Sequence, residues 1–242
     1  MYIMQSIFKR YEIKYLITKE QSIQLQKAIS QYMTQDQYGE YLVQNLYYDT
    51  ENWDIIRASI EKPLYKEKMR LRCYGEASGE SKFYLELKKK YKSVVYKRRI
   101  AIPAQSLIGN SVQAAITETP SQISRELDFY MRSNEVSEKI YIAYQRLAFA
   151  GITDEGLRVT IDTDVRFRLD DLSFSNSTVG QYVLPDGKIL MEVKALGGMP
   201  LWMANALSEN GVFPTSFSKF GTCYTDHIYK HICEERKVKI CA

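Results

Sequence analysis

Apolar and charged residues alternate with a period of two along several stretches of the chain. In residues Lys68–Tyr74, for example, Arg70 and Arg72 alternate with Leu71. Successive side chains of a β-strand point to opposite faces, so this pattern predicts strands with one apolar and one charged face. The pattern covers Phe8–Ile17, Lys68–Tyr74, Phe83–Lys90, Val94–Ile102, Tyr141–Phe149, Leu157–Val165 and Lys188–Leu196, and an aromatic strand is expected over Leu42–Tyr48.

Helices are predicted between and after these strands. The first follows Thr18, which forms a capping box with Gln21, and the second is capped by Ser121. A third is expected over Pro200–Gly211, because proline favours the first position of a helix and glycine the position just past its end. The last is expected over about Ser218–Arg236. Many strands with few helices indicate an α+β fold.

The bulk composition fits one large domain. The chain has 242 residues, of which 45% are apolar, and this is enough for a proper core. Because no linker or repeat interrupts the sequence, we expect a single domain over residues 1–242. The net charge of +4 is small, since 33 basic and 29 acidic residues nearly cancel, so it only hints at an anionic partner.

The placement of the basic residues is more informative than their number. For any one strand, a charged face favours the simple interpretation of a half-buried sheet with one side in water. Here long basic side chains dominate that face on strand after strand, and such a surface would repel itself. A dry core could not hold these charges either. We therefore predict a closed, eight-stranded antiparallel β-tunnel with a wet basic interior, because closure also removes the sheet edges. Helices would cover its apolar outside.

The ligand expected in such a tunnel is a chain of phosphates, because arginine binds phosphate oxygens in a bidentate way. Carboxylates share the same face and favour a divalent cation that bridges protein and phosphate oxygens. The acidic candidates are Glu12, Glu86, Asp162 and Glu192. The basic candidates are Arg10, Lys14, Arg70, Arg72, Lys88, Lys97, Arg146, Arg158 and Lys194.

The cysteines and the N-terminal residues indicate in which cellular compartment the protein is expected. The four cysteines form no CxxC pair, which favours free thiols in a reducing environment. The N-terminal residues lack the apolar core of a signal peptide, and no stretch approaches the roughly 20 apolar residues of a membrane span. We expect a cytoplasmic protein. A position at the inner face of a membrane, through a membrane-protein partner, stays open.

An ordered set of motifs resembles the polyphosphate polymerase domain of the vacuolar transporter chaperone (VTC) family, which belongs to the CYTH-like triphosphate tunnel metalloenzymes. The motifs are RYEIKY (Arg10–Tyr15), LYYDT (Leu46–Thr50), KMRLRCYG (Lys68–Gly75), ELKKK (Glu86–Lys90), YQRLAF (Tyr144–Phe149), LRVTID (Leu157–Asp162), LMEVK (Leu190–Lys194) and SFSKF (Ser216–Phe220). Two features depart from the family pattern: Ser216 replaces an expected lysine, and only Glu12 and Lys14 remain of an ExExK motif.

The resemblance implies an enzyme that transfers the γ-phosphoryl group of ATP to a phosphate or polyphosphate acceptor, with Mn²⁺ or Mg²⁺ bound. It implies that Tyr144 and Ser218 add hydrogen bonds and that Glu192 holds the metal, to which the carboxylate pattern adds Glu12 and Glu86 as candidates. The expected catalytic residues are Lys14, Arg70, Arg72, Lys88, Arg146, Arg158 and Lys219. The expected substrate-binding residues are Arg10, Lys97, Tyr144, Lys194 and Ser218.

Other functions use the same cations. One alternative is a hydrolase of inorganic triphosphate or nucleoside triphosphates, which would admit water as the acceptor. Another is a non-catalytic module that binds polyphosphate or inositol phosphates for a membrane or kinase partner. Nucleic acid is not expected as a partner, because a narrow tunnel suits a linear phosphate chain better than a strand that carries bases.

Overall fold

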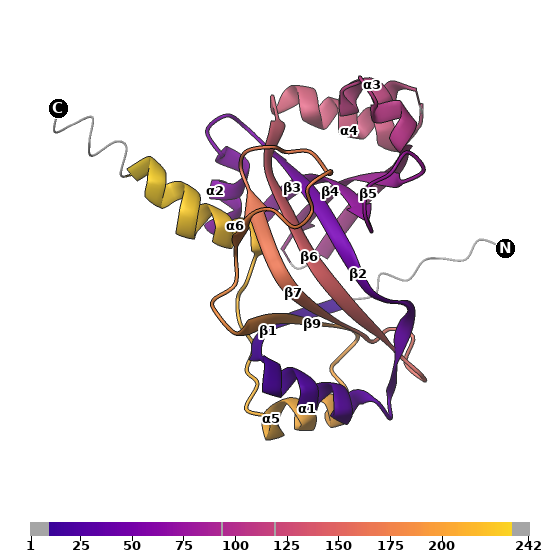
Figure 1. Cartoon of the computed structure of the whole chain (residues 1–242), viewed down its shortest axis with the longest axis vertical. Coiled ribbons are helices and arrows are strands. Elements are labelled where there is room, and N and C mark those ends of the chain that lie inside the picture. The colour runs from indigo at the N-terminus through magenta and orange to yellow at the C-terminus, as the bar shows by residue number, and fades with distance from the viewer. Residues whose placement is uncertain (1–9, 93, 119, 234–242) are drawn as a thin grey trace. The chain divides into compact units, whose positions relative to one another are not determined.

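The computed structural model describes residues 10–92, 94–118 and 120–233. Figure 1 shows the strands and helices of this part of the chain. Its strands are β1 (Arg10–Thr18), β2 (Met33–Asp49), β3 (Tyr65–Tyr74), β4 (Lys82–Tyr91), β5 (Val94–Pro103), β6 (Ser137–Gly151), β7 (Arg158–Arg168), β8 (Gln181–Tyr182) and β9 (Lys188–Leu196). Each strand that the alternation predicts is present, and β2 and β6 extend well beyond their predicted ends.

The α-helices are α1 (Lys19–Ile29), α2 (Asp54–Ile60), α3 (Val112–Thr117), α4 (Gln122–Ser133), α5 (Leu201–Glu209) and α6 (Lys219–Cys223), with a 3₁₀ turn, η1 (Ala104–Leu107), and a π-helical turn, η2 (Tyr224–Ile228). The capping box of Thr18 with Gln21 and the cap at Ser121 are confirmed. None of the described helices is long and apolar enough to cross a membrane. The predicted end of the last helix lies outside the described residues.

The strands form one nine-stranded sheet in the described part of the chain, in the order β1-β9-β7-β6-β2-β3-β4-β5, with β8 paired to β7. The prediction of an antiparallel sheet is confirmed for the pairings of β1 with β9, β9 with β7 and β2 through β5. The prediction of eight strands closed into a tunnel is corrected in two respects. β8 is an additional, two-residue strand in a polar stretch without periodicity, and the described path ends at β1 and β5 without a pairing between them.

The repulsion among the charged side chains is smaller than the excess of basic residues suggests, because carboxylates on these faces are paired with arginines. In the structure, carboxylates pair with the cations on the same faces: Glu86 with Arg70, and Asp162 with Arg146. These pairs remove much of the repulsion that seemed to require a closed tunnel.

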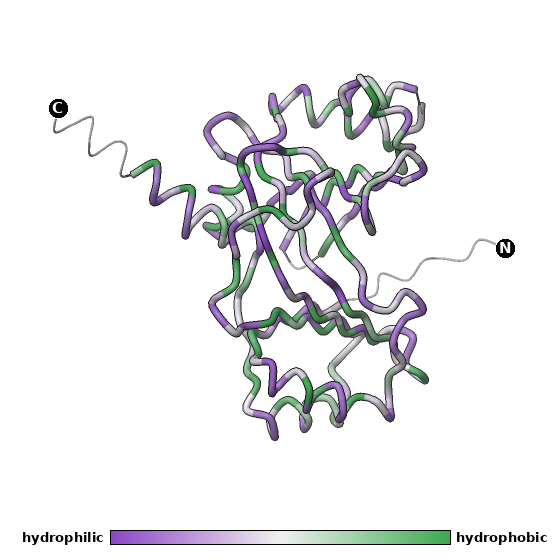
Figure 2. Tube along the Cα trace, viewed as in Figure 1, coloured by the Kyte–Doolittle hydropathy of each residue, from purple (hydrophilic) through white to green (hydrophobic). Residues whose placement is uncertain are grey.

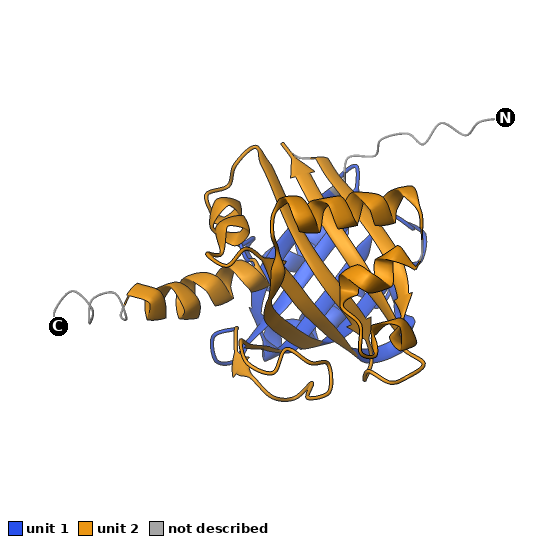
Figure 3. Cartoon of the chain, turned by 90° about the horizontal axis from the view of Figure 1, so that it is seen from above, with its two compact units in different colours: residues 1–41, 145–164, 184–217 blue, residues 42–144, 165–183, 218–242 orange. Residues whose placement is uncertain are grey.

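The chain divides into two compact units (Figure 3). Unit 1 contains residues 1–41, 145–164 and 184–217, and unit 2 contains residues 42–144, 165–183 and 218–242. Each unit has a hydrophobic core of its own.

The core of unit 1 lies between its strands and the two helices α1 and α5. Tyr15 and Met191 are buried on the apolar faces of β1 and β9, and α1 contributes Leu25 to the same core. α5 packs beside α1 and adds Met203. Figure 2 shows hydrophobic and hydrophilic positions alternating along these strands. The expectation that helices cover the apolar face of the sheet is confirmed here.

The core of unit 2 lies between β3, β4 and β5 and the helices α3 and α4. Leu71 and Leu85 are buried on the strands, and Leu127 of α4 is fully buried against them. Arg98 breaks the alternation of β5 because it shares the apolar side with Ile100. Its guanidinium Nε lies 2.9 Å from a carboxylate oxygen of Glu126 on α4, so the helix that covers this face also neutralises the charge.

Leu127→Ala should destabilise the protein by about 2–5 kcal/mol, because it leaves a cavity in the core of unit 2. Phe129 lies on the same helix and is 72% exposed, so Phe129→Ala is the matched control and should change stability by less than about 0.5 kcal/mol. Urea denaturation of both variants measures the difference. Equal losses of stability would contradict this description of the core.

Candidate anion-binding site

The charged faces of the strands collect most of the predicted site residues, and each unit has such a face. In unit 2, Glu86 occupies the middle of β4 and is 1% exposed. The strand register places it directly opposite Arg70 of β3 and Arg99 of β5. Strand pairing therefore brings two guanidinium groups from separate strands to one buried carboxylate.

The Glu86 carboxylate is bound by three cations. Arg70 donates to Oε2 from Nε and NH2, both at 2.8 Å. Lys97 Nζ lies 2.5 Å from Oε1, and Arg99 Nε lies 3.1 Å from the same oxygen. The side chains of Arg70, Lys97 and Arg99 remain 24%, 43% and 36% exposed. An anion in solvent can therefore reach all three.

Aromatic hydroxyls orient the arginines of β3. Arg70 NH1 donates to the Tyr47 hydroxyl at 3.1 Å. Arg72 is nearly buried; its Nε donates to Asn45 Oδ1 at 2.8 Å and its NH2 to the Tyr144 hydroxyl at 3.3 Å. Fixed guanidinium groups lose little freedom when they bind a ligand, which suits them to bidentate phosphate recognition.

The pKa of Tyr74 reflects the positive electrostatic potential of the charged face of unit 2. Arg72 and Arg99 both donate to its hydroxyl, at 3.3 and 3.4 Å. Burial raises the pKa of this phenol, but the two guanidinium groups lower it more, so its pKa lies below the ordinary value of 10.0. The same field that favours a phenolate would favour a phosphate oxygen.

The segment that begins α6 brings two more predicted residues to unit 2. Lys219 Nζ lies 4.1 Å from the centre of the Tyr144 ring, a cation–π contact. The Ser218 hydroxyl caps α6 by accepting from the Gly221 amide, and it also accepts from Lys68 Nζ at 3.1 Å. Ser218 thus has a structural role in the helix start.

The charged face of unit 1 is more fully paired. Arg146 and Asp162 form a bidentate pair, with Nε to Oδ1 at 2.6 Å and NH2 to Oδ2 at 2.8 Å. Arg158 is 52% exposed and lies 3.6 Å from Asp36. Of the two arginines, Arg158 is therefore the more accessible to an anion.

The acidic residues of unit 1 lie on neighbouring strands. β1 pairs with β9 so that Glu12 faces Lys194 and Lys14 faces Glu192. Within each strand a lysine pairs with the carboxylate two residues away: Lys194 Nζ with Glu192 at 2.5 Å and Lys14 Nζ with Glu12 at 3.7 Å. Lys14 Nζ also donates to the Phe217 carbonyl at 3.0 Å.

The three predicted metal ligands are divided between the two units. Glu12 and Glu192 belong to unit 1 and Glu86 to unit 2, and the described residues contain no group of three or more acidic, histidine or cysteine side chains suited to a metal. Glu86 does not fit a metal, because cations engage both of its oxygens. Glu12 and Glu192 fit the pattern in which one or two carboxylates hold Mg²⁺ and substrate phosphates supply further ligands.

Two further predicted residues lie on β4 and β1. Lys88 is exposed and faces Lys68 and Lys97 in the strand register. Arg10 begins β1, but its side chain lies outside the described part of the structure.

Sequence reasoning missed Arg99, Tyr47 and Asn45. Arg99 could have been found from the alternation that selected Lys97, whereas the two β2 residues gave no charge signal.

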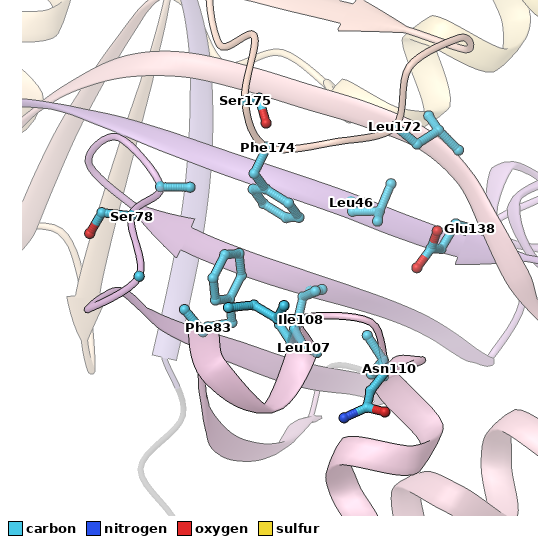
Figure 4. A pocket seen from close by; sticks show the side chains of 15 residues that line it. Leu46, Ser78, Phe83, Leu107, Ile108, Asn110, Glu138, Leu172, Phe174 and Ser175 are labelled. Carbon is cyan, nitrogen blue, oxygen red and sulfur yellow. The ribbon is translucent and has the colours of Figure 1, made fainter.

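A separate pocket of about 470 Å³ lies in unit 2 (Figure 4). Leu46, Phe83 and Phe174 contribute to its mainly apolar lining. The lining contains no lysine or arginine among the described residues, so this pocket is unsuited to a polyanion.

Several known structures share this fold. A candidate adenylyl cyclase from Hippeastrum with a dominant triphosphatase activity matches with a TM-score of 0.50 and 19% identity, over 86% of this chain and 92% of its own. Candidate adenylate cyclases from Bacillus halodurans and Vibrio parahaemolyticus match with TM-scores of 0.51 and 0.50 and identities of 15% and 10%. They cover 87% and 91% of this chain, and 95% and 100% of their own lengths. The chain thus shares its fold with these proteins.

The sequence then assigns the family. Residues 9–227 match the VTC domain, so the chain belongs to the VTC domain family. No curated protein matches it in sequence. The predicted resemblance is confirmed.

The Glu86 cluster makes stability depend on pH in the acid range. Burial works to raise the pKa of this carboxyl, but nearby cations, first of all Arg70 and Arg72, lower it from 4.5 to about 2. A lowered pKa in the folded state stabilises the protein above the unfolded pKa, and that contribution is lost as pH falls from about 4.5 towards 2. It amounts to roughly 3 kcal/mol. The stability gap between the unaltered protein and Glu86→Gln, measured by urea denaturation, should shrink over this window. A gap that is constant between pH 6 and pH 3 would contradict the assignment.

Proposed function

We propose that the chain is an ATP-dependent polyphosphate polymerase, which transfers the γ-phosphoryl group to a phosphate or polyphosphate acceptor. The observation that carries the proposal is the preorganised cation cluster of unit 2, where Glu86 and the Tyr47 hydroxyl hold Arg70, and the Tyr144 hydroxyl holds Arg72. Membership of the VTC domain family supports the choice of activity. The free thiols of Cys73 and Cys223 are in keeping with action in the cytoplasm, where ATP is available.

The proposed chemistry needs no protein nucleophile. An oxygen of the acceptor phosphate forms a bond to the γ-phosphorus, the bond from that phosphorus to the β–γ bridging oxygen breaks, and ADP leaves with the electron pair. Catalysis of this kind is mostly positioning and charge stabilisation. Arg70, Arg72 and Lys219 are proposed to bind and orient the phosphates in unit 2. Further proposed contacts come from Lys14, Lys88, Lys97, Arg146, Arg158, Lys194, Tyr144 and Ser218.

A divalent cation, Mn²⁺ or Mg²⁺, would neutralise charge on the phosphate oxygens when bound. Glu192 is the proposed ligand, with Glu12 on the adjacent strand as its neighbour. Lys194 and Lys14 pair with these carboxylates in the described structure. When the carboxylates bind metal, these lysines are proposed to release them and to contact phosphate oxygens instead.

A hydrolase is the second candidate, because the Hippeastrum protein that shares the fold has a dominant triphosphatase activity. The two candidates differ only in the acceptor, which is phosphate in one case and water in the other. Their binding residues would be the same. The products of the reaction therefore distinguish them.

Incubation of the purified protein with ATP and Mn²⁺ or Mg²⁺ should yield ADP and polyphosphate, resolved by chain length on a gel. Orthophosphate as the sole phosphate product would reject the polymerase and favour the hydrolase. Tight binding of tripolyphosphate without turnover would reject both enzymes and favour a binding module.

Glu192→Gln in the same assay should reduce turnover by at least a hundredfold, because it removes the proposed metal ligand. Metal-free binding of tripolyphosphate, measured by calorimetry, should persist. Glu209 is an exposed acid on α5 of the same unit, so Glu209→Gln is the control and should leave both quantities unchanged. Full activity of Glu192→Gln would show that this residue holds no essential metal.

A further inference from the structure

The surroundings of Glu86 suggest a function other than the metal binding that its sequence position predicts. It is a buried carboxylate in the middle strand of three, and its partners come from both neighbouring strands. Arg70 occupies one carboxylate oxygen, and Lys97 and Arg99 occupy the other. A carboxylate whose two oxygens both contact cations is electrostatically unfavourable for a metal ion, but it fixes the positions of the three cations.

The same carboxylate offsets the repulsion among these cations. Each ends within about 3 Å of the carboxylate, and three positive charges brought so close together would repel each other strongly at the low dielectric of a partly buried site. Removal of one partner from a buried ionic cluster is strongly unfavourable, because the remaining charges lose their compensation. The cluster therefore depends on Glu86 to keep its geometry in the absence of a ligand.

We infer that Glu86 is a positioning residue for phosphate binding, which holds Arg70, Lys97 and Arg99 together as one preorganised cluster. The inference rests on the proposed function and extends it. A guanidinium group has five N–H donors, so an arginine that binds Glu86 keeps others for a phosphate. Phosphates that enter the cluster meet donors already fixed by Glu86, and the cost of ordering three long side chains is met during folding.

Electrostatics alone predicts the opposite effect of removing this charge. Glu86→Gln makes the face more positive, and at low salt the added attraction would favour an anion. At roughly 0.5 M salt, with a Debye length of about 4 Å, long-range attraction is screened and the geometry of the donors dominates. Binding should therefore be measured at high salt, where the positioning effect is isolated.

The chain contains a matched control for this experiment. Glu126 of α4 also pairs with two cations, Lys89 at 3.2 Å and Arg98 at 2.9 Å, but it does so on the apolar side of the same strands. Glu126→Gln removes ion pairs of a more exposed carboxylate from the same unit without touching the charged face. A general effect of lost ion pairs would appear in both variants.

The test is metal-free binding of tripolyphosphate by isothermal calorimetry at high salt, with thermal denaturation to identify folded protein. Glu86→Gln should bind roughly tenfold more weakly than the unaltered protein, the loss of about 1.4 kcal/mol expected when one charge-assisted arrangement is lost. Glu86→Asp keeps the charge on a shorter side chain and should bind with intermediate affinity. Glu126→Gln should bind as the unaltered protein does.

Equal affinity of Glu86→Gln and the unaltered protein would overturn the inference, as would equal losses in Glu86→Gln and Glu126→Gln. If Glu86→Gln does not fold, Glu86→Asp decides: unchanged affinity would reject the positioning role. Failure of the unaltered protein to bind tripolyphosphate would count against the proposed function itself.

Discussion

The structure depends on the compensation of charge along the polar faces of its strands. Strand alternation places long basic side chains side by side, an arrangement that would destabilise a sheet unless carboxylates stand among them. Glu86 in unit 2 and Asp162 in unit 1 meet this need, each buried and each bound by arginine. Because the compensation is local, each unit keeps a stable basic face without any ligand. The same cations are the groups that we propose to bind a polyanion.

The two units distribute their charges differently, and this bears on function. In unit 2 cations outnumber the carboxylate that they share, and Lys97 and Arg99 remain accessible to solvent. In unit 1, Arg146 is paired with Asp162 in a bidentate way, and Glu192 is paired with Lys194. The first arrangement suits the binding of phosphate. The second supplies carboxylates that suit a metal bound together with a phosphate ligand.

The sequence predicted the strands well because alternation is a local signal that the register then preserves. It could not predict α2, which begins after Trp53 in a left-handed conformation and whose first amides donate to the buried side chain of Asp49. The sequence also could not show which residues far apart in the chain contact each other. Arg98 weakened the pattern of β5 because its partner, Glu126, belongs to a helix that follows in the chain. At Glu86 the sequence shows a carboxylate, but it does not show the three cations that surround it.

Family membership and the charged faces together support phosphate chemistry, and the central claim is that a phosphate chain binds to these faces. Acetylation of lysines in the presence of tripolyphosphate, mapped by mass spectrometry, tests this claim most directly. Lys97 and Lys219 should be protected, whereas the exposed Lys19 and Lys27 of α1 should react as they do without ligand. Uniform reactivity of all four lysines, with tripolyphosphate bound, would contradict the account.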